Sequence, residues 1–195
     1  MARGIIDRDG LRRADIRKLY EVETPGDVPF AARKISHVVL KVADLERSVH
    51  FYSQVMGFRV SDAYPETMMP GRMAFLRCND DHHGIALVGG GRGPSENREL
   101  HHFAFEVDSL DEVFQAREHL KSHGVEIDFE GRRRAGQQIA LEFSDPDGHR
   151  LEICWGMDRL GPDDRSRPPE QWREAFSLED AVRDAPKGQD TEQSD

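Results

Sequence analysis

An internal repeat constrains the fold of this 195-residue chain more than any other feature of its sequence. His102 follows His37 by 65 residues (102 − 37), and the residues after both histidines match at the same separation. Further on the separation grows to 67 residues (124 − 57), where Gly124 matches Gly57. A repeat of this length predicts two copies of one unit, each built of a strand, a helix and further strands. The other residues matched at 65 are Val42, Leu45 and Val49 with Val107, Leu110 and Phe114.

Each copy opens with a short strand that contains a histidine near its start. Residues 35–42 and 100–107 are rich in β-branched and aromatic side chains, and the second stretch alternates with period two, as strands do. The alternation puts Phe103 on the core-facing side and His102 on the opposite side. We therefore expect His102 to point away from the apolar core. The neighbouring His101 is the alternative, although its parity places it with the core-facing residues.

The helix of each copy has recognisable start and stop residues. Asp44 is the expected N-cap of a helix over 45–56 that ends at Gly57, and Ser109 opens a capping box before the second helix. The expected fold class is α+β. Further strands are expected over 58–64, 73–78, 83–88, 125–129, 138–143 and 149–155.

The same patterns divide the chain into three parts. These are an N-terminal arm at 1–34, a repeated domain at 35–156 with modules 35–90 and 98–156, and a C-terminal extension at 157–195. The arm is expected to pack on the domain or on a partner subunit, with closure over a site as the alternative. The last dozen residues of the extension are polar and are expected to be disordered.

Composition excludes several classes of function. The net charge of −10 makes nucleic acid a poor partner. No signal peptide or long apolar run is found, so no membrane association is expected. The chain has two cysteines, which do not make a disulfide framework. A reducing cytoplasm is the expected compartment.

A final motif connects these features to a known family. Asp145-Pro146-Asp147-Gly148-His149 leads into the last strand of the second copy. Together with the histidine-led strands and capped helices, it resembles the vicinal oxygen chelate (glyoxalase/bleomycin resistance/extradiol dioxygenase) superfamily, and within it the single-domain type I extradiol ring-cleaving dioxygenases. The resemblance covers residues 35–156. It implies paired βαβββ modules whose strands form a cup-shaped mixed sheet around one divalent metal, Fe(II) or Mn(II).

Three side chains are the candidate metal ligands: His37, His102 and Glu152. Both histidines occupy the same position of the repeat, and strand alternation puts Glu152 opposite Leu151 and Ile153. Two imidazoles and one carboxylate make a facial triad that leaves positions open for a chelating diol and O₂. Superfamily members with other chemistries usually add a fourth ligand from the first copy. Residues 85–88 carry no carboxylate or amide there, which favours the dioxygenase interpretation.

Two further residues are candidates for catalysis and substrate binding. The resemblance implies that His83 is the acid–base catalyst, since an imidazole exchanges protons near neutral pH; the alternative is an ordinary loop histidine at a strand entry. The family usually has a tyrosine on strand 139–143 and a second histidine before it, whereas this chain has Glu142 there. Glu142 could accept a hydrogen bond from a substrate hydroxyl, act as an extra metal ligand, or be exposed.

The leading hypothesis is an Fe(II)-dependent extradiol dioxygenase that cleaves a catechol-type aromatic vicinal diol with O₂. The alternatives are a metal-dependent isomerase, lyase or epimerase, and a non-catalytic protein that binds a small molecule. Apolar residues in the two tails suggest a homo-oligomer.

Overall fold

The computed structural model describes residues 6–23, 29, 34–97, 99–160 and 165–191. The first module contains β1 (Val38–Lys41), α2 (Leu45–His50) with the π-helical turn η2 (Phe51–Val55), β2 (Arg59–Tyr64), β3 (Met73–Arg77) and β4 (Ile85–Val88). The second contains β5 (Phe103–Glu106), α3 (Leu110–Ser122), β6 (Ile127–Arg132), β7 (Ile139–Ser144) and β8 (Arg150–Trp155). Both modules are βαβββ units, so the predicted α+β class is confirmed.

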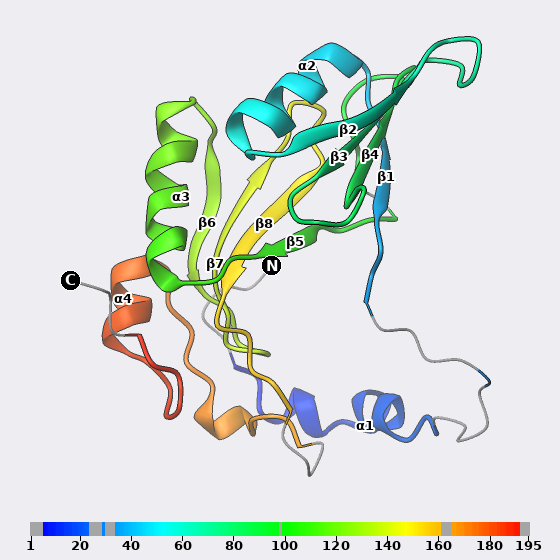
Figure 1. Ribbon diagram of the computed structural model, residues 1–195. Helices are drawn as coiled ribbons and strands as arrows, with labels where there is room; N and C mark the ends of the chain where they lie inside the picture. Colours follow the sequence, from blue (N-terminus) through cyan, green and yellow to red (C-terminus); the bar gives the residue numbers. More distant parts are fainter. Residues whose placement is uncertain (1–5, 24–28, 30–33, 98, 161–164, 192–195) are drawn as a thin grey trace.

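Each module forms its own four-stranded mixed sheet, in the order β1-β4-β3-β2 and β5-β8-β7-β6 (Figure 1). The first strand of each module is parallel to the last, and the other pairs are antiparallel. Among the described residues the two sheets are not joined into one. The predicted pair of βαβββ modules is confirmed, as two four-stranded mixed sheets that are not closed on each other.

Local sequence explains the two module helices. The carboxylate of Asp44 accepts the N–H of Arg47 at 3.0 Å, and Ser109 forms a complete capping box with Glu112, as predicted. Gly57 adopts φ 72°, a left-handed conformation that suits glycine after a helix. The second helix has 13 residues, whereas α2 and η2 have 6 and 5. The helix α3 is therefore two residues longer than α2 and η2 together, which accounts for the change in the repeat separation from 65 to 67 residues.

One hydrophobic core runs through both modules. It contains apolar residues of the first sheet, such as Leu76 and Leu87, and of the second sheet, such as Leu141 and Leu151. The ring of Phe58 meets that of Phe105 edge-on, with centroids 5.2 Å apart, across the module boundary. Burial of these surfaces at about 25 cal/mol per Å² is the main term that holds the modules together.

A polar joint adds to this core. The turn at 145–148, which joins β7 to β8, contacts α2 of the other module. The Asp147 carboxylate accepts the N–H of Ala43 and the hydroxyl of Ser48, both at 2.8 Å. The hydroxyl of Tyr52, in the π-helical turn, donates to Asp145 at 3.0 Å. Every one of these groups is buried or part-buried, so the bonds are shielded from competing water.

The C-terminal extension attaches to the second sheet. Arg132 and Ala175 form an antiparallel bridge, with N–H to carbonyl distances of 3.0 and 3.3 Å. Gly131 permits this approach, because a Cβ there would lie 2.1 Å from the carbonyl oxygen of Ala175. Arg132 itself is fully buried and donates to Gln189 Oε1 and to the carbonyls of Ala181 and Asp184.

The remaining helical elements lie in the two tails: η1 (Gly10–Arg12), α1 (Ala14–Tyr20), η3 (Pro169–Gln171) and α4 (Leu178–Arg183). Within the described part of the chain, every helix is too short or too polar to cross a membrane. The predicted division at residues 34 and 156 stays a prediction, as does the disorder of the last dozen residues, of which 192–195 lie outside the described part.

Candidate metal and substrate site

His102 and Glu152 come together at one end of the second sheet. Ala104 pairs with Glu152 in the β5–β8 register, and His102 lies two residues before Ala104, so both side chains can share a face. His102 Nε2 lies 3.5 Å from Glu152 Oε2. Two ligand atoms at right angles on one metal ion, each bonded at roughly 2.1 Å, are about 3 Å apart. The pair therefore has nearly the spacing that a shared ion requires.

The Glu152 side chain is 2% exposed. Burial raises the pKa of this carboxyl, while a hydrogen bond from Gln138 at 3.4 Å and the nearby His102 act in the opposite direction. Glu142, its cross-strand partner on β7, contributes to the rise through like charge. A buried carboxylate with these neighbours gains from a cation beside it.

His37 and His83 form a second pair, in the first module. Their ring centroids are 4.6 Å apart. His83 Nδ1 lies 2.9 Å from Nδ1 of His82, and His82 Nε2 lies 2.9 Å from Oδ2 of Asp62. Burial, followed by the neighbouring His37 and His82, lowers the pKa of His83, which favours its neutral form.

The structure thus brings the predicted residues together as two pairs. Among the described residues, no three His, Cys, Asp or Glu side chains are grouped so that they could hold a metal ion. The pair of His102 and Glu152 fits one ion, and His37 is not gathered with it. The nitrogen and oxygen donors of the predicted triad suit Fe(II) or Mn(II). The three-residue site stays a prediction.

The strand registers identify the first module's counterpart of Glu152. Val38 pairs with Ile85 as Phe103 pairs with Leu151, so Ala86 on β4 corresponds to Glu152 on β8. Ala86 is fully buried and offers only a methyl group. The position that would provide a fourth ligand in the first module therefore has no donor atom.

A pocket of about 490 Å³ surrounds His102 and Glu152. Glu142 is not a free carboxylate in it, because Arg133 Nε donates to Glu142 Oε1 at 2.8 Å. The Arg133 guanidinium also lies over the Phe129 ring, 3.6 Å from its centroid. The pocket is lined by four acidic residues and three arginines together with His101, His102, Gln138, Phe143 and Leu151; the charged residues are Asp128, Glu142, Glu152, Glu174, Arg133, Arg134 and Arg150.

Sequence reasoning did not identify three of these residues as part of a site. Gln138 donates to Glu152, and Arg150 flanks the entrance to β8. Glu174 comes from the C-terminal extension, outside the repeat. Strand alternation along 138–143 could have indicated Gln138, which has the parity of Glu142. No sequence pattern indicates Glu174.

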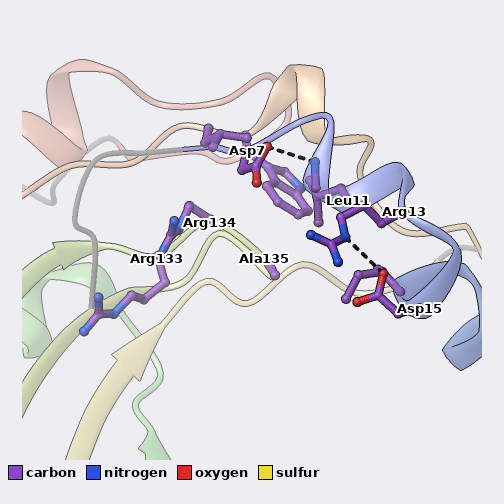
Figure 2. A pocket seen from close by; sticks show the side chains of 11 residues that line it. Asp7, Leu11, Arg13, Asp15, Arg133, Arg134 and Ala135 are labelled. Atoms are coloured by element: carbon purple, nitrogen blue, oxygen red, sulfur yellow. Dashed lines mark hydrogen bonds and ion pairs between the residues drawn. The ribbon is translucent and has the colours of Figure 1, made fainter.

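A larger pocket, of about 660 Å³, lies on the other side of Arg133 and Arg134. Figure 2 shows Leu11, Arg13 and Asp15 of the arm on one side of it and Ala135 with the two arginines on the other. The arginines line both pockets, so this loop separates the arm from the pocket around Glu152. None of the predicted metal ligands lines the larger pocket.

Known proteins with similar sequences are found over most of this chain. A family model described as Glyoxalase/Bleomycin resistance protein/Dioxygenase superfamily matches residues 34–153. A biphenyl-2,3-diol 1,2-dioxygenase of Metapseudomonas furukawaii is 30% identical over 155 residues, which are 76% of this chain and 50% of that protein. A manganese-dependent 2,3-dihydroxybiphenyl 1,2-dioxygenase of Geobacillus genomosp. 3 is 29% identical over 129 residues, 65% of this chain and 38% of that protein.

The chain spans about half the length, or less, of these curated relatives. A solved glyoxylase/bleomycin resistance protein/dioxygenase domain from Frankia sp. EAN1pec superposes with a TM-score of 0.56 at 23% identity, over 65% of this chain and 99% of that domain. This likeness concerns the fold.

Proposed function

Because the chain belongs to the glyoxalase/bleomycin resistance protein/dioxygenase superfamily, we propose that it is an extradiol dioxygenase acting on a catechol-type aromatic vicinal diol with O₂. The observation that carries the proposal is the pair of the exposed His102 and the buried Glu152, 3.5 Å apart in a pocket of about 490 Å³. Relatives named as dioxygenases of aromatic diols support it. The absence of a donor at Ala86 agrees with a metal held by three residues rather than four.

We propose that His37, His102 and Glu152 hold a divalent ion, with Fe(II) as the first candidate and Mn(II) as the second. His37 is included because it occupies the position in the first module that His102 has in the second. When bound, the ion supplies a centre at which the two hydroxyls of a diol and O₂ can bind together.

His83 is the proposed proton carrier. If His82 donates from Nε2 to Asp62, its Nδ1 is an acceptor, and His83 then donates from its own Nδ1. This arrangement leaves a lone pair on Nε2 of His83. That nitrogen can take a proton from a substrate hydroxyl and return it later in the reaction.

Glu142 is proposed to act as a pair with Arg133 and not as a free carboxylate. The ion pair fixes the Glu142 side chain on the pocket wall. Oε1 of Glu142 accepts a hydrogen bond from Arg133, so Oε2 is the atom that we propose accepts a hydrogen bond from a substrate hydroxyl. This pairing also argues against Glu142 as a general base for an isomerase or lyase.

The test is anaerobic reconstitution with Fe(II) or Mn(II), followed by a panel of catechols and then O₂. We expect one O₂ consumed for each ring opened, with a yellow product. His102→Ala should lose both bound metal and ring cleavage, whereas His50→Ala, an exposed histidine on α2, should keep both.

Two other results would redirect the assignment. Turnover of a substrate without O₂ uptake would support a metal-dependent isomerase, lyase or epimerase. Ligand binding with no bound metal under any condition would support a non-catalytic binding protein.

A further inference from the structure

Glu174 is the third glutamate, after Glu142 and Glu152, that lines the pocket around His102. It reaches the pocket because Ala175 bridges to Arg132 on β6. Gly131, next to this bridge, has no side chain that would collide with the Ala175 carbonyl. The backbone of the extension is therefore fixed one residue away from Glu174.

The two carboxylate oxygens of Glu174 have different surroundings. The side chain is 6% exposed, and Oε1 lies 3.4 Å from Arg134 Nε. Oε2 is buried and has no hydrogen-bond partner among the described residues. Native proteins leave few buried polar atoms unpaired, because an unpaired one loses its hydration without compensation. A buried acceptor of this kind on a pocket wall is suited to a donor from a ligand.

The other glutamates of the pocket already have partners. Glu142 accepts a hydrogen bond from Arg133. Glu152 accepts a hydrogen bond from Gln138 and lies next to His102. Oε2 of Glu174 is thus an acceptor with unused capacity on a residue that lines the pocket, and the buried Oε1 of Gln138 is a second one. The negative charge of Glu174 also disfavours any ligand that carries a carboxylate on the same side.

We propose that Glu174 determines specificity by accepting a hydrogen bond from a donor substituent of the substrate. The substrate class is then a vicinal aromatic diol with an additional hydroxyl or amino group. Diols that carry a methyl group or a carboxylate in that position are disfavoured. This inference rests on the proposed function, since it assumes that a diol occupies the pocket.

The experiment measures anaerobic binding by calorimetry on the metal-loaded protein. Two matched pairs of ligands differ only by hydroxyl against methyl: 1,2,3-trihydroxybenzene with 3-methylcatechol, and 1,2,4-trihydroxybenzene with 4-methylcatechol. A hydrogen bond to a charged acceptor predicts a preference of about tenfold or more for the hydroxyl member of one pair. Glu174→Met should remove this preference, and Glu174→Gln should retain part of it because the amide oxygen still accepts.

Glu179→Gln is the matched control. It changes a glutamate of the same extension that pairs with Arg117 at 2.8 Å and does not line the pocket, so its ligand preference should equal that of the unmodified protein. An unchanged preference in Glu174→Met for both pairs, with diols still bound, overturns the inference and leaves the proposed function standing. Failure of every diol to bind the unmodified protein rejects the proposed function, and the inference falls with it.

Discussion

Replacing Asp147 with alanine removes the central acceptor of the joint between the modules. Asp147 is 1% exposed and accepts from Ala43 N–H and from Ser48 Oγ, while Arg47 Nη2 lies 3.0 Å away. Burial alone would raise the pKa of Asp147, but these hydrogen bonds outweigh it and lower the pKa. The carboxylate is therefore charged at neutral pH and bound more favourably in the folded chain than in the unfolded one.

The magnitude follows from the bonds that are lost. Each buried hydrogen bond to a charged acceptor contributes about 1.5–3 kcal/mol, so losing two costs about 3–6 kcal/mol. The Arg47 side chain is about half exposed, so that ion pair adds at most about 1 kcal/mol. We expect Asp147→Ala to lower the free energy of unfolding by about 3–7 kcal/mol and Asp147→Asn by about 2 kcal/mol, since the amide oxygen keeps one bond.

Urea denaturation followed by far-ultraviolet circular dichroism measures this directly. Asp80→Ala, in the exposed segment between β3 and β4, is the matched control and should change stability by less than about 0.5 kcal/mol. A double-mutant cycle with Ser48→Ala should give a coupling of about 0.5–3 kcal/mol. A loss below about 1 kcal/mol for Asp147→Ala, with an unchanged m value, would refute the idea that this turn joins the modules.

Three other predictions follow from the site and its surroundings. Arg133→Ala leaves the part-buried Glu142 without its partner and should lower the free energy of unfolding by about 1–2 kcal/mol in urea titrations; no change would mean that the pair does not stabilise the folded state. The hydrogen bond to Asp145 raises the pKa of His149, although burial opposes the rise. The folded chain therefore binds this proton more tightly, so the stability advantage over His149→Gln should be full below pH 6.5 and disappear as the pH rises through the folded pKa; an advantage that grows with pH contradicts this. Removal of the proposed metal with a chelator should lower thermal stability by about 4 kcal/mol when the ion had been present at a thousand times its Kd, and His102→Ala should show no response to metal.

The sequence predicted the strands and helices of the two modules well, because strand alternation and helix capping depend on residues close together in the chain. The 65-residue separation of His37 and His102 reflects equivalent strand registers, with Val38 opposite Ile85 and Phe103 opposite Leu151. Alternation along β8 correctly separated Glu152 from its core-facing neighbours. The two helix caps, at Asp44 and Ser109, were also predicted correctly, since an N-cap depends on residues within one turn.

What the sequence could not supply depends on contacts between distant segments. Alternation relates His102 to Glu152 within one sheet, but it does not specify how two sheets are oriented, and His37 lies in the other sheet. The pairing of Arg133 with Glu142 depends on a hairpin whose strand β6 extends further than predicted, to residue 132. Glu174 enters the pocket through a single backbone bridge, which has no periodicity to detect.

The turn at 145–148 also determines what the repeat means for folding. If the first module were alone, Ser48 and Tyr52 would lose acceptors that only the second module provides. If the second were alone, Asp145 and Asp147 would lose donors that come from the first, and the shared core would be exposed on both halves. The two copies resemble each other in sequence and in topology, yet we expect neither to be an autonomous folding unit. We expect the pair to unfold as one cooperative unit.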